Sequence, residues 1–131
     1  MKIKKIVTAR DALARLTEKR FTDYKKVRAI VKLRQAVDAE FEIYAAEEKK
    51  AVDTYAELNG NGTPAFLPDG RLKLKDEKAK VAFESEIAAL LDSEVDSIEP
   101  IQITEKDFRS ADDLPTPDDM IALDGLVDFV D

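Results

Sequence analysis

Closely spaced carboxylates are the residues of this sequence that most resemble a catalytic or metal-binding motif. They form three pairs: Glu84 with Glu86, Asp112 with Asp113, and Asp118 with Asp119. A glycosidase or a carboxylate metal site needs two such groups converging on a cleft, with one environment shifting a pKa. These pairs fall on segments expected to be exposed helix faces, caps and loops, where solvation explains them. We therefore predict no catalytic residue, no metal site and no enzyme.

The residue types that are missing exclude further chemistry. The 131 residues include no His, no Cys and no Trp. Without Cys there is no disulfide framework and no thiolate nucleophile, and without His the usual base at neutral pH is absent. The four Ser and seven Thr therefore lack a histidine partner. The run Asn59–Gly60–Asn61–Gly62 offers oxygens but not the spacing of a calcium loop, and no Gly-rich phosphate loop occurs. We predict no cofactor.

Basic side chains near the N-terminus could bind phosphate groups along a helix. Three of them, Lys25, Arg28 and Lys32, share one side of a predicted helix, and we call them the basic face. Two other interpretations remain open: a solvated helix face, or an internal partner for acidic residues elsewhere. Because the net charge is −7, we do not expect nucleic acid as a partner.

The charge is unevenly distributed along the chain. Residues 1–34 carry a net +9, residues 35–80 a net −3, and residues 81–131 a net −13. A basic head and an acidic tail can lie against each other within one fold, can meet between subunits, or can each bind an external partner. The acidic tail also fits a surface that mimics nucleic acid.

A long helix over residues 22–58 is the strongest structural prediction, because this stretch lacks Gly and Pro. At 1.5 Å per residue it would be about 55 Å long, and its apolar positions form one stripe. Such a helix needs other helices, from its own chain or a partner, to cover the stripe. We call the following positions the helix seam: Val27, Ile30, Val37, Phe41, Tyr44, Val52 and Tyr55.

Three charged residues lie close to the seam rather than on the polar face. Arg34 and Asp38 are one turn apart and can pair, while Glu48 can extend its carboxylate to solvent. Alternatively, these groups set the register of a helix–helix contact, as in a coiled coil.

Shorter elements flank the long helix. Thr8, Asp76 and Thr116 are predicted helix N-caps, and either Thr22 or Asp23 is the predicted N-cap of the long helix. Gly60 is predicted to close the long helix in a left-handed conformation, and Pro68–Asp69–Gly70 to form a hairpin turn. The expected elements are a strand over 2–7, a helix over 8–19, a hairpin over 63–75, a helix over 76–93, an extended segment over 95–104 and a C-terminal helix over 117–130.

Together these elements predict an α+β fold, mostly α, as a single domain over residues 1–131. It would consist of a long antiparallel helical hairpin, a small antiparallel sheet and a short C-terminal helix. The segment 95–104 is expected to pair with the strand over 2–7. No apolar run approaches the length of a membrane span, and no signal sequence is evident, so we expect no membrane association and a cytoplasmic protein.

The order of these motifs resembles a type of short bacteriophage and prophage protein. The likeness rests on "KIKKIV", the long "KLRQAVDAEFEIYAAEEKKAVDTYAEL" helix, "NGNG", "PDG", "FESEIAALLDSEVDSIEPIQI" and "LPTPDDMIALDGLVDF". Members of this type have no agreed activity, so no functional residue is carried over. The layout is also similar to that of prefoldin, whose helical hairpins assemble through strands and hold clients between helix tips.

We therefore expect a non-enzymatic, oligomeric interaction protein of phage or prophage origin, acting in the cytoplasm of a bacterial host. It would bind itself, or a phage or host protein, in assembly, as a chaperone-like factor, or in host-protein binding. The alternative is an acidic inhibitor that mimics nucleic acid and blocks a host nucleic-acid-binding protein such as a defence nuclease.

Overall fold

Helix α1 (Ile3–Thr17) begins directly after the N-terminal two residues in the computed structural model, which describes residues 1–130. The predictions of a strand over 2–7 and a helix over 8–19 are therefore wrong in their boundaries and in the type of the first element. Ile3 and Ile6 continue the helical spacing of Leu13 and Leu16, and all four are buried; six residues are too few to separate this period from alternation. Thr8 is no cap, because its hydroxyl donates to the Lys4 carbonyl within the helix.

Helix α2 (Tyr24–Tyr55) is the expected long helix with shorter ends. The Asp23 carboxylate accepts a hydrogen bond from the Lys25 N–H at 2.9 Å, so the predicted cap is confirmed. The helix ends three residues before Leu58, and Gly60 does not close it, because its φ is not positive.

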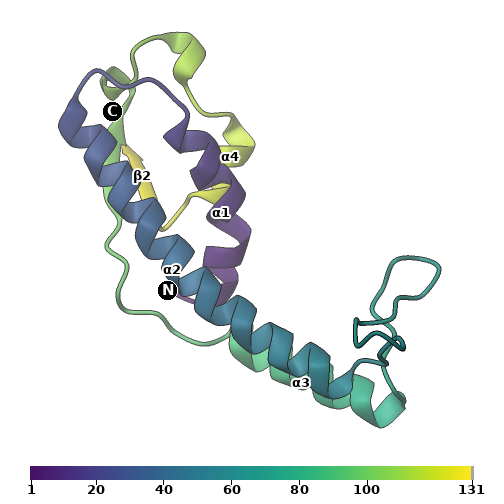
Figure 1. Ribbon diagram of the computed structural model, residues 1–131. Coiled ribbons are helices and arrows are strands. Elements are labelled where there is room, and N and C mark those ends of the chain that lie inside the picture. The colour runs from purple at the N-terminus through teal and green to yellow at the C-terminus, as the bar shows by residue number, and fades with distance from the viewer. Residues whose placement is uncertain (131) are drawn as a thin grey trace. The chain divides into compact units, whose positions relative to one another are not determined.

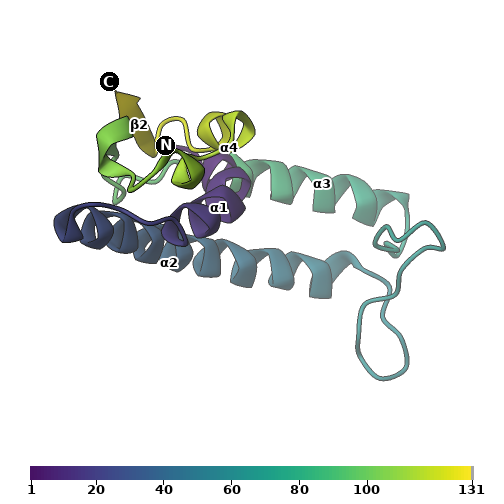
Figure 2. The same cartoon turned by 90° about the horizontal axis from the view of Figure 1, so that it is seen from above.

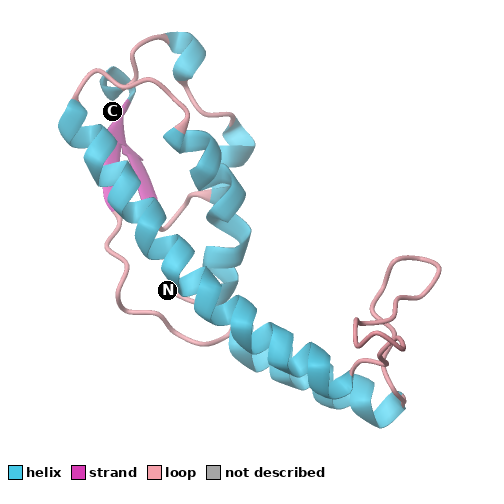
Figure 3. Cartoon of the chain, viewed as in Figure 1, coloured by secondary structure: helices cyan, strands magenta, loops and turns pink. Residues whose placement is uncertain are grey.

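Three short extended segments follow α2 and pair with one another at their ends. Isolated antiparallel bridges join Ala56 to Leu74, Leu58 to Pro64, and Phe66 to Leu72. The Glu57 N–H donates to the Lys73 carbonyl, the Lys73 N–H to the Ala65 carbonyl, and the Ala65 N–H to the Glu57 carbonyl. The three segments therefore close on each other, and their mutual hydrogen bonds replace a regular sheet; Figure 3 draws this stretch as loop.

Two turns of the same kind connect these segments. Gly62 and Gly70 have φ values of 84° and 89°. In each turn the glycine N–H donates to the carbonyl three residues back, that of Asn59 or Leu67. Such a turn, followed by a left-handed residue, is a common hairpin connection that favours glycine at its last position. The predicted hairpin around Pro68–Asp69–Gly70 is thus confirmed as a turn flanked by antiparallel bridges.

Helix α3 (Glu77–Leu91) begins at the predicted cap, since the Asp76 carboxylate accepts from the Ala79 N–H at 2.7 Å. It runs beside the second half of α2 in both views (Figures 1 and 2), and the Tyr55 hydroxyl donates to Glu86 at 2.7 Å. The long antiparallel helical hairpin expected from the sequence stays a prediction.

The C-terminal part of the chain contains little helix. The predicted helix over 117–130 is wrong beyond Ala122, because Gly125, with φ 88°, turns the chain into a strand. Its start is correct, since the Thr116 hydroxyl accepts from the Asp119 N–H. The elements are β1 (Ile101–Thr104), the 3-10 helices η1 (Glu105–Asp107) and η2 (Ala111–Asp113), α4 (Pro117–Ala122) and β2 (Val127–Val130).

The sheet consists of β1 and β2 in parallel, with Ile101 opposite Val127 and Thr104 opposite Val130. The predicted antiparallel sheet is therefore wrong, and so is the predicted partner of residues 95–104. The start of this region instead contacts the N-terminus through an isolated bridge between Lys2 and Glu94, beside which the Val95 N–H donates to the Met1 carbonyl at 2.7 Å. The chain is mostly helical (57%) with this small sheet and one short C-terminal helix.

The chain divides into two compact units, where the sequence predicted one domain. Unit 1 comprises Met1–Phe41 and Glu94–Asp131, and unit 2 comprises Glu42–Ser93. Within unit 1, α4 packs on α1, and α1, α4 and β2 lie on one side of α2 (Figure 2). Among residues 1–130, no helix combines the length and apolar character that crossing a bilayer requires.

Candidate functional site

The N-terminal part of the helix seam forms the interior of unit 1. Ile30 and Val37 are buried, with exposed fractions of 1% and 0%, while Val27 and Phe41 are half-buried. The Arg10 guanidinium lies 3.9 Å from the centre of the Phe41 ring, a cation–π contact between α1 and α2. These four seam residues therefore pack against other parts of unit 1.

The charged residues beside the seam bind α1 to α2. Arg34 pairs with Asp38 at 3.7 Å, as predicted, and also donates to the Thr17 hydroxyl at 2.7 Å. Asp38 also accepts a hydrogen bond from Arg10 at 3.2 Å. Since both residues on α2 have partners on α1, they help to set the register of that contact.

The C-terminal part of the seam lies in unit 2 and is less well covered. Tyr44 is buried, while Val52 and Tyr55 are half-buried. The Tyr44 hydroxyl donates to Glu48 at 2.6 Å, and burial together with this bond raises the pKa of Tyr44. The Glu86 carboxylate raises the pKa of Tyr55 in the same way. Each hydroxyl is thus held by a carboxylate.

The basic face lies on the exposed side of α2. Lys25, Arg28 and Lys32 are all exposed, and within residues 1–130 none of them forms an ion pair. Lys26, one position away, differs, because it donates to the Gln102 carbonyl at 2.7 Å and pairs with Asp107 at 3.6 Å. The three residues are therefore brought together as predicted, on a solvated surface.

The basic head and the acidic tail meet inside unit 1. The N-terminal ammonium group pairs with Glu94 at 2.9 Å, and Arg15 binds both carboxylate oxygens of Asp119, the closest at 2.7 Å. The Arg15 guanidinium holds the pKa of Asp119 below its ordinary value. Asp107 also has a lowered pKa, chiefly because the Thr104 backbone N–H donates to it. Internal pairing of head and tail is confirmed for these groups.

The carboxylate pairs do not converge on a common site. Within them, Glu86 binds Tyr55, Asp113 accepts hydrogen bonds from Ser110 and the Arg20 N–H, and Asp119 binds Arg15. Residues 1–130 contain no group of three or more His, Cys, Asp or Glu placed to hold a metal ion.

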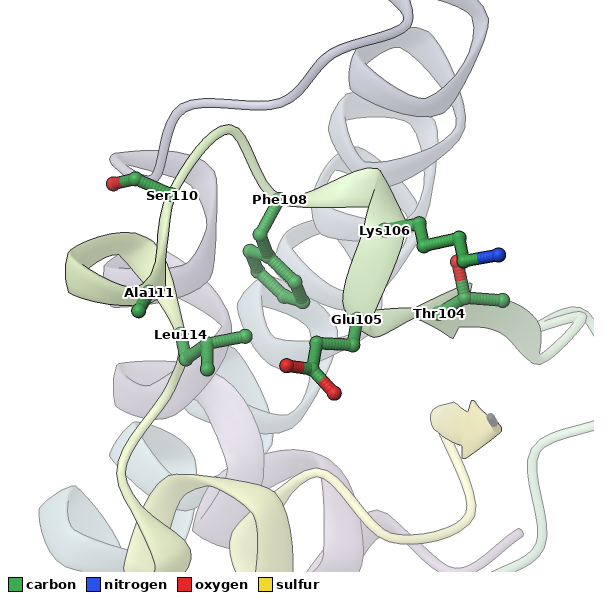
Figure 4. A pocket seen from close by; sticks show the side chains of 7 residues that line it. All are labelled: Thr104, Glu105, Lys106, Phe108, Ser110, Ala111 and Leu114. Carbon is green, nitrogen blue, oxygen red and sulfur yellow. The ribbon is translucent and has the colours of Figure 1, made fainter.

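A hollow of about 640 Å³ lies around η1 and η2 in unit 1. Figure 4 shows the side chains of Phe108, Leu114 and Glu105 directed toward one another, while Lys106 is directed away from them. Phe108 also packs against Phe21, with ring centres 5.0 Å apart. The lining contains a single carboxylate and no nucleophile–base pair, so the geometry provides no recognisable reaction centre.

Sequence reasoning missed the exposed apolar residues of unit 2. Ile43, Leu58, Phe66 and Val81 have exposed fractions of 62%, 43%, 63% and 61%. Moreover, α3 contains no buried residue. The sequence shows that residues 81–91 are rich in apolar side chains, but it does not show that the fold leaves none of these side chains fully buried.

The comparisons with known proteins identify no relative: no family model, no curated protein and no solved structure matches this chain.

Proposed function

We propose that this chain is a non-enzymatic protein–protein interaction factor whose contact surface lies in unit 2. The observation that carries the proposal is the contrast between the two units. Of the twenty buried apolar side chains among residues 1–130, only Tyr44, Ala51 and Ala56 belong to unit 2. A unit that encloses so few of its apolar side chains gains stability when another molecule buries them.

Unit 2 also has the kind of order that a binding surface needs. The mutual hydrogen bonds of residues 57, 65 and 73 fix the segments that carry Leu58 and Phe66. A side chain on a fixed backbone loses less entropy on binding than one on a free loop. Phe66, an exposed aromatic residue, is the kind of side chain that contributes most to protein interfaces.

The finer architecture belongs to the same proposal. We propose that α2 and α3 act as a long antiparallel helical hairpin that presents this surface, as in the prefoldin-like layout. On the resemblance of the motifs, we further propose a phage or prophage origin and a role in the bacterial cytoplasm, in assembly, as a chaperone-like factor or in binding a host protein.

The alternative function, nucleic-acid mimicry, has less support. A mimic needs its carboxylates free to occupy a basic groove, whereas Glu94, Asp107 and Asp119 of the acidic tail have basic partners in the head of the same chain. We therefore propose the interaction factor alone.

Site-specific photo-crosslinking in the organism that carries the gene tests the proposal. A benzophenone amino acid replaces Phe66 or Ile43, and, as a matched control, Tyr24, which is 74% exposed and lies in unit 1. We expect protein adducts from positions 66 and 43 and none from position 24. No adduct from either unit 2 position, or equal adducts from Tyr24, would refute the proposal.

A further inference from the structure

The sheet of unit 1 has two outer edges, because within residues 1–130 β1 and β2 pair only with each other. Along a strand, the backbone groups of successive residues point alternately to one side and to the other. The Ile101 N–H donates to the Leu126 carbonyl at 3.0 Å, so Ile101 and Ile103 direct their N–H and C=O groups toward β2. Gln102 and Thr104 therefore direct theirs to the outer edge of β1.

Side chains of unit 1 cover this outer edge of β1. The Lys26 ammonium donates to the Gln102 carbonyl at 2.7 Å. The Asp107 carboxylate accepts from the Thr104 N–H, also at 2.7 Å. Charged side chains are one of the devices by which proteins protect a strand edge from further pairing. No strand can add to β1 at these two residues without displacing them.

The outer edge of β2, by contrast, is open at Phe129. Since the Leu126 carbonyl faces β1, Asp128, two positions on, faces it as well. Val127 and Phe129 therefore face outward. The Val127 N–H is occupied, because it donates to the Leu123 carbonyl at 2.9 Å. Within residues 1–130, neither the N–H nor the C=O of Phe129 has a hydrogen-bond partner. An antiparallel strand pairs with such a donor and acceptor on one residue.

A hollow of about 270 Å³ lies beside this open edge, and most of its lining is apolar. The side chains around it include those of Phe129, Val130, Phe108, Leu114 and Met120. Ile103, which lies opposite Phe129 in the sheet, is fully buried, whereas Phe129 is half-buried. The apolar face of the sheet is thus incompletely covered at β2. An added strand places the side chain opposite Phe129 on this same face, at the hollow.

The carboxylates around the open edge favour a basic partner. Asp128 is exposed on β2, and Glu105 lines both this hollow and the larger one around η1 and η2. Within residues 1–130 neither carboxylate forms an ion pair. Lys106 is directed away from the Glu105 carboxylate (Figure 4). A second copy of β2 would add acidic side chains to an acidic edge, which costs free energy.

We propose that the open edge of β2 binds an extended segment of another protein in which basic residues flank an apolar one. The N–H and C=O of the apolar residue pair with Phe129, its side chain enters the hollow, and a flanking base lies near Asp128. In such strand additions, backbone hydrogen bonds give affinity and pockets for alternate side chains give specificity. This site goes beyond the proposed function, because it lies in unit 1; Tyr24 lines neither hollow.

Peptides tested on the purified full-length protein examine each part of the proposal. A fluorescein-labelled heptapeptide that alternates lysine with valine should bind saturably, as measured by fluorescence anisotropy. Glutamate in place of lysine should weaken binding at least about tenfold. N-methylation of the valines, whose N–H groups face β2, should weaken binding at least about fivefold more than N-methylation of the lysines, whose N–H groups face away.

Hydrogen exchange followed by NMR locates the bound peptide. We expect the Phe129 amide to exchange at least about fivefold more slowly when the lysine–valine peptide is bound. The Val127 amide should change little, because it already donates to Leu123. If the Phe129 amide instead becomes protected as the protein concentration rises without peptide, a second copy occupies the edge and the proposal is wrong.

Two variants test the charge at the edge. Asp128→Lys should weaken binding of the lysine–valine peptide at least about fivefold. Glu18→Lys, which makes the same change at an exposed residue after α1, should bind it like the wild type. Circular dichroism checks the fold, and Asp128→Asn repeats the test if Asp128→Lys is unfolded. The proposal is overturned by no binding at about 1 mM peptide, by equal binding of the two N-methylated peptides, or by an unchanged Phe129 amide. Variants at Asp128 that bind as tightly as the wild type would also overturn it.

Discussion

Arg15 and Asp119 show how single residues join distant parts of this chain. Although 104 positions apart, they form a two-pronged contact in which the arginine donates to both carboxylate oxygens. Asp119 also lies in the first turn of α4, where a negative charge is favourable. With an exposed fraction of 7%, it is the one buried charged side chain among residues 1–130. Such a group stabilises the fold only while it is ionised and paired.

The pH dependence of stability should therefore depend on Asp119. Its pKa in the folded state is below the ordinary value of 3.8, so its contribution is complete above that value and is lost as the pH falls through the lower, folded pKa. We expect Asp119→Asn to lower the free energy of unfolding at neutral pH by about 1 kcal/mol, with the difference from wild type shrinking in acid. Denaturant titrations between neutral pH and strong acid measure it.

Asp118→Asn is the matched control, because Asp118 is adjacent and exposed. It should change the free energy of unfolding by less than about 0.5 kcal/mol. If the two variants show the same stability at every pH, the Arg15–Asp119 contact does not stabilise the fold as described.

Among the elements, the segment over residues 56–75 depends most on backbone conformation. Its antiparallel bridges are isolated, and Ala56 is its one buried residue. Two turns and the hydrogen bonds among residues 57, 65 and 73 therefore hold the segment together. Gly62 and Gly70 occupy the left-handed region, whereas Gly60, two positions before Gly62, does not. Glycines of the same loop thus have different structural requirements.

Gly70→Ala should weaken this segment, while Gly60→Ala should not. An alanine at φ 89° costs about 1 kcal/mol, although neither position has a neighbouring atom within 4 Å of an added Cβ. We expect the amides of Ala65 and Lys73 to exchange about fivefold faster with solvent in Gly70→Ala. Hydrogen exchange followed by NMR measures this. Equal exchange in both variants would show that the turn conformation does not limit opening.

At the scale of the whole molecule, the two units have very different cores. Helices α1 and α3 are both 15 residues long, yet α1 contributes six buried residues and α3 none. Burial of apolar side chains is the main source of stability. We therefore expect unit 1 to be the more stable of the two units.

This contrast predicts unequal stability within one chain. In dilute protein, the amides of α3 should exchange through partial opening, much faster than those of α1 around Leu13. If the chain self-associates through unit 2, as expected of an oligomeric interaction protein, the protection of α3 should rise with protein concentration while that of α1 stays constant. Hydrogen exchange with mass spectrometry at two concentrations measures both. Equal protection of α1 and α3 in dilute protein would contradict the difference between the units.

Much of the local structure was predictable because it depends on neighbours in sequence. The caps at Asp23, Asp76 and Thr116, the long helix and the Pro68–Asp69–Gly70 turn all rest on interactions within a few residues. Local signals failed where two structures share one pattern. The stretch 2–7 satisfies both alternation and helical spacing, and residues 127–130 satisfy the apolar face of a helix as well as a strand.

The amino-acid sequence alone determined the helical character of this protein, the absence of His and Cys chemistry, and the polarity from a basic head to an acidic tail. Only the tertiary structure decided that β1 pairs with β2 in parallel, that Arg15 meets Asp119, and that the apolar residues of unit 2 lack cover. The physical reason is the range of the interactions. Caps, turns and helical periods act over a few residues, whereas strand pairing and burial depend on which distant segments meet.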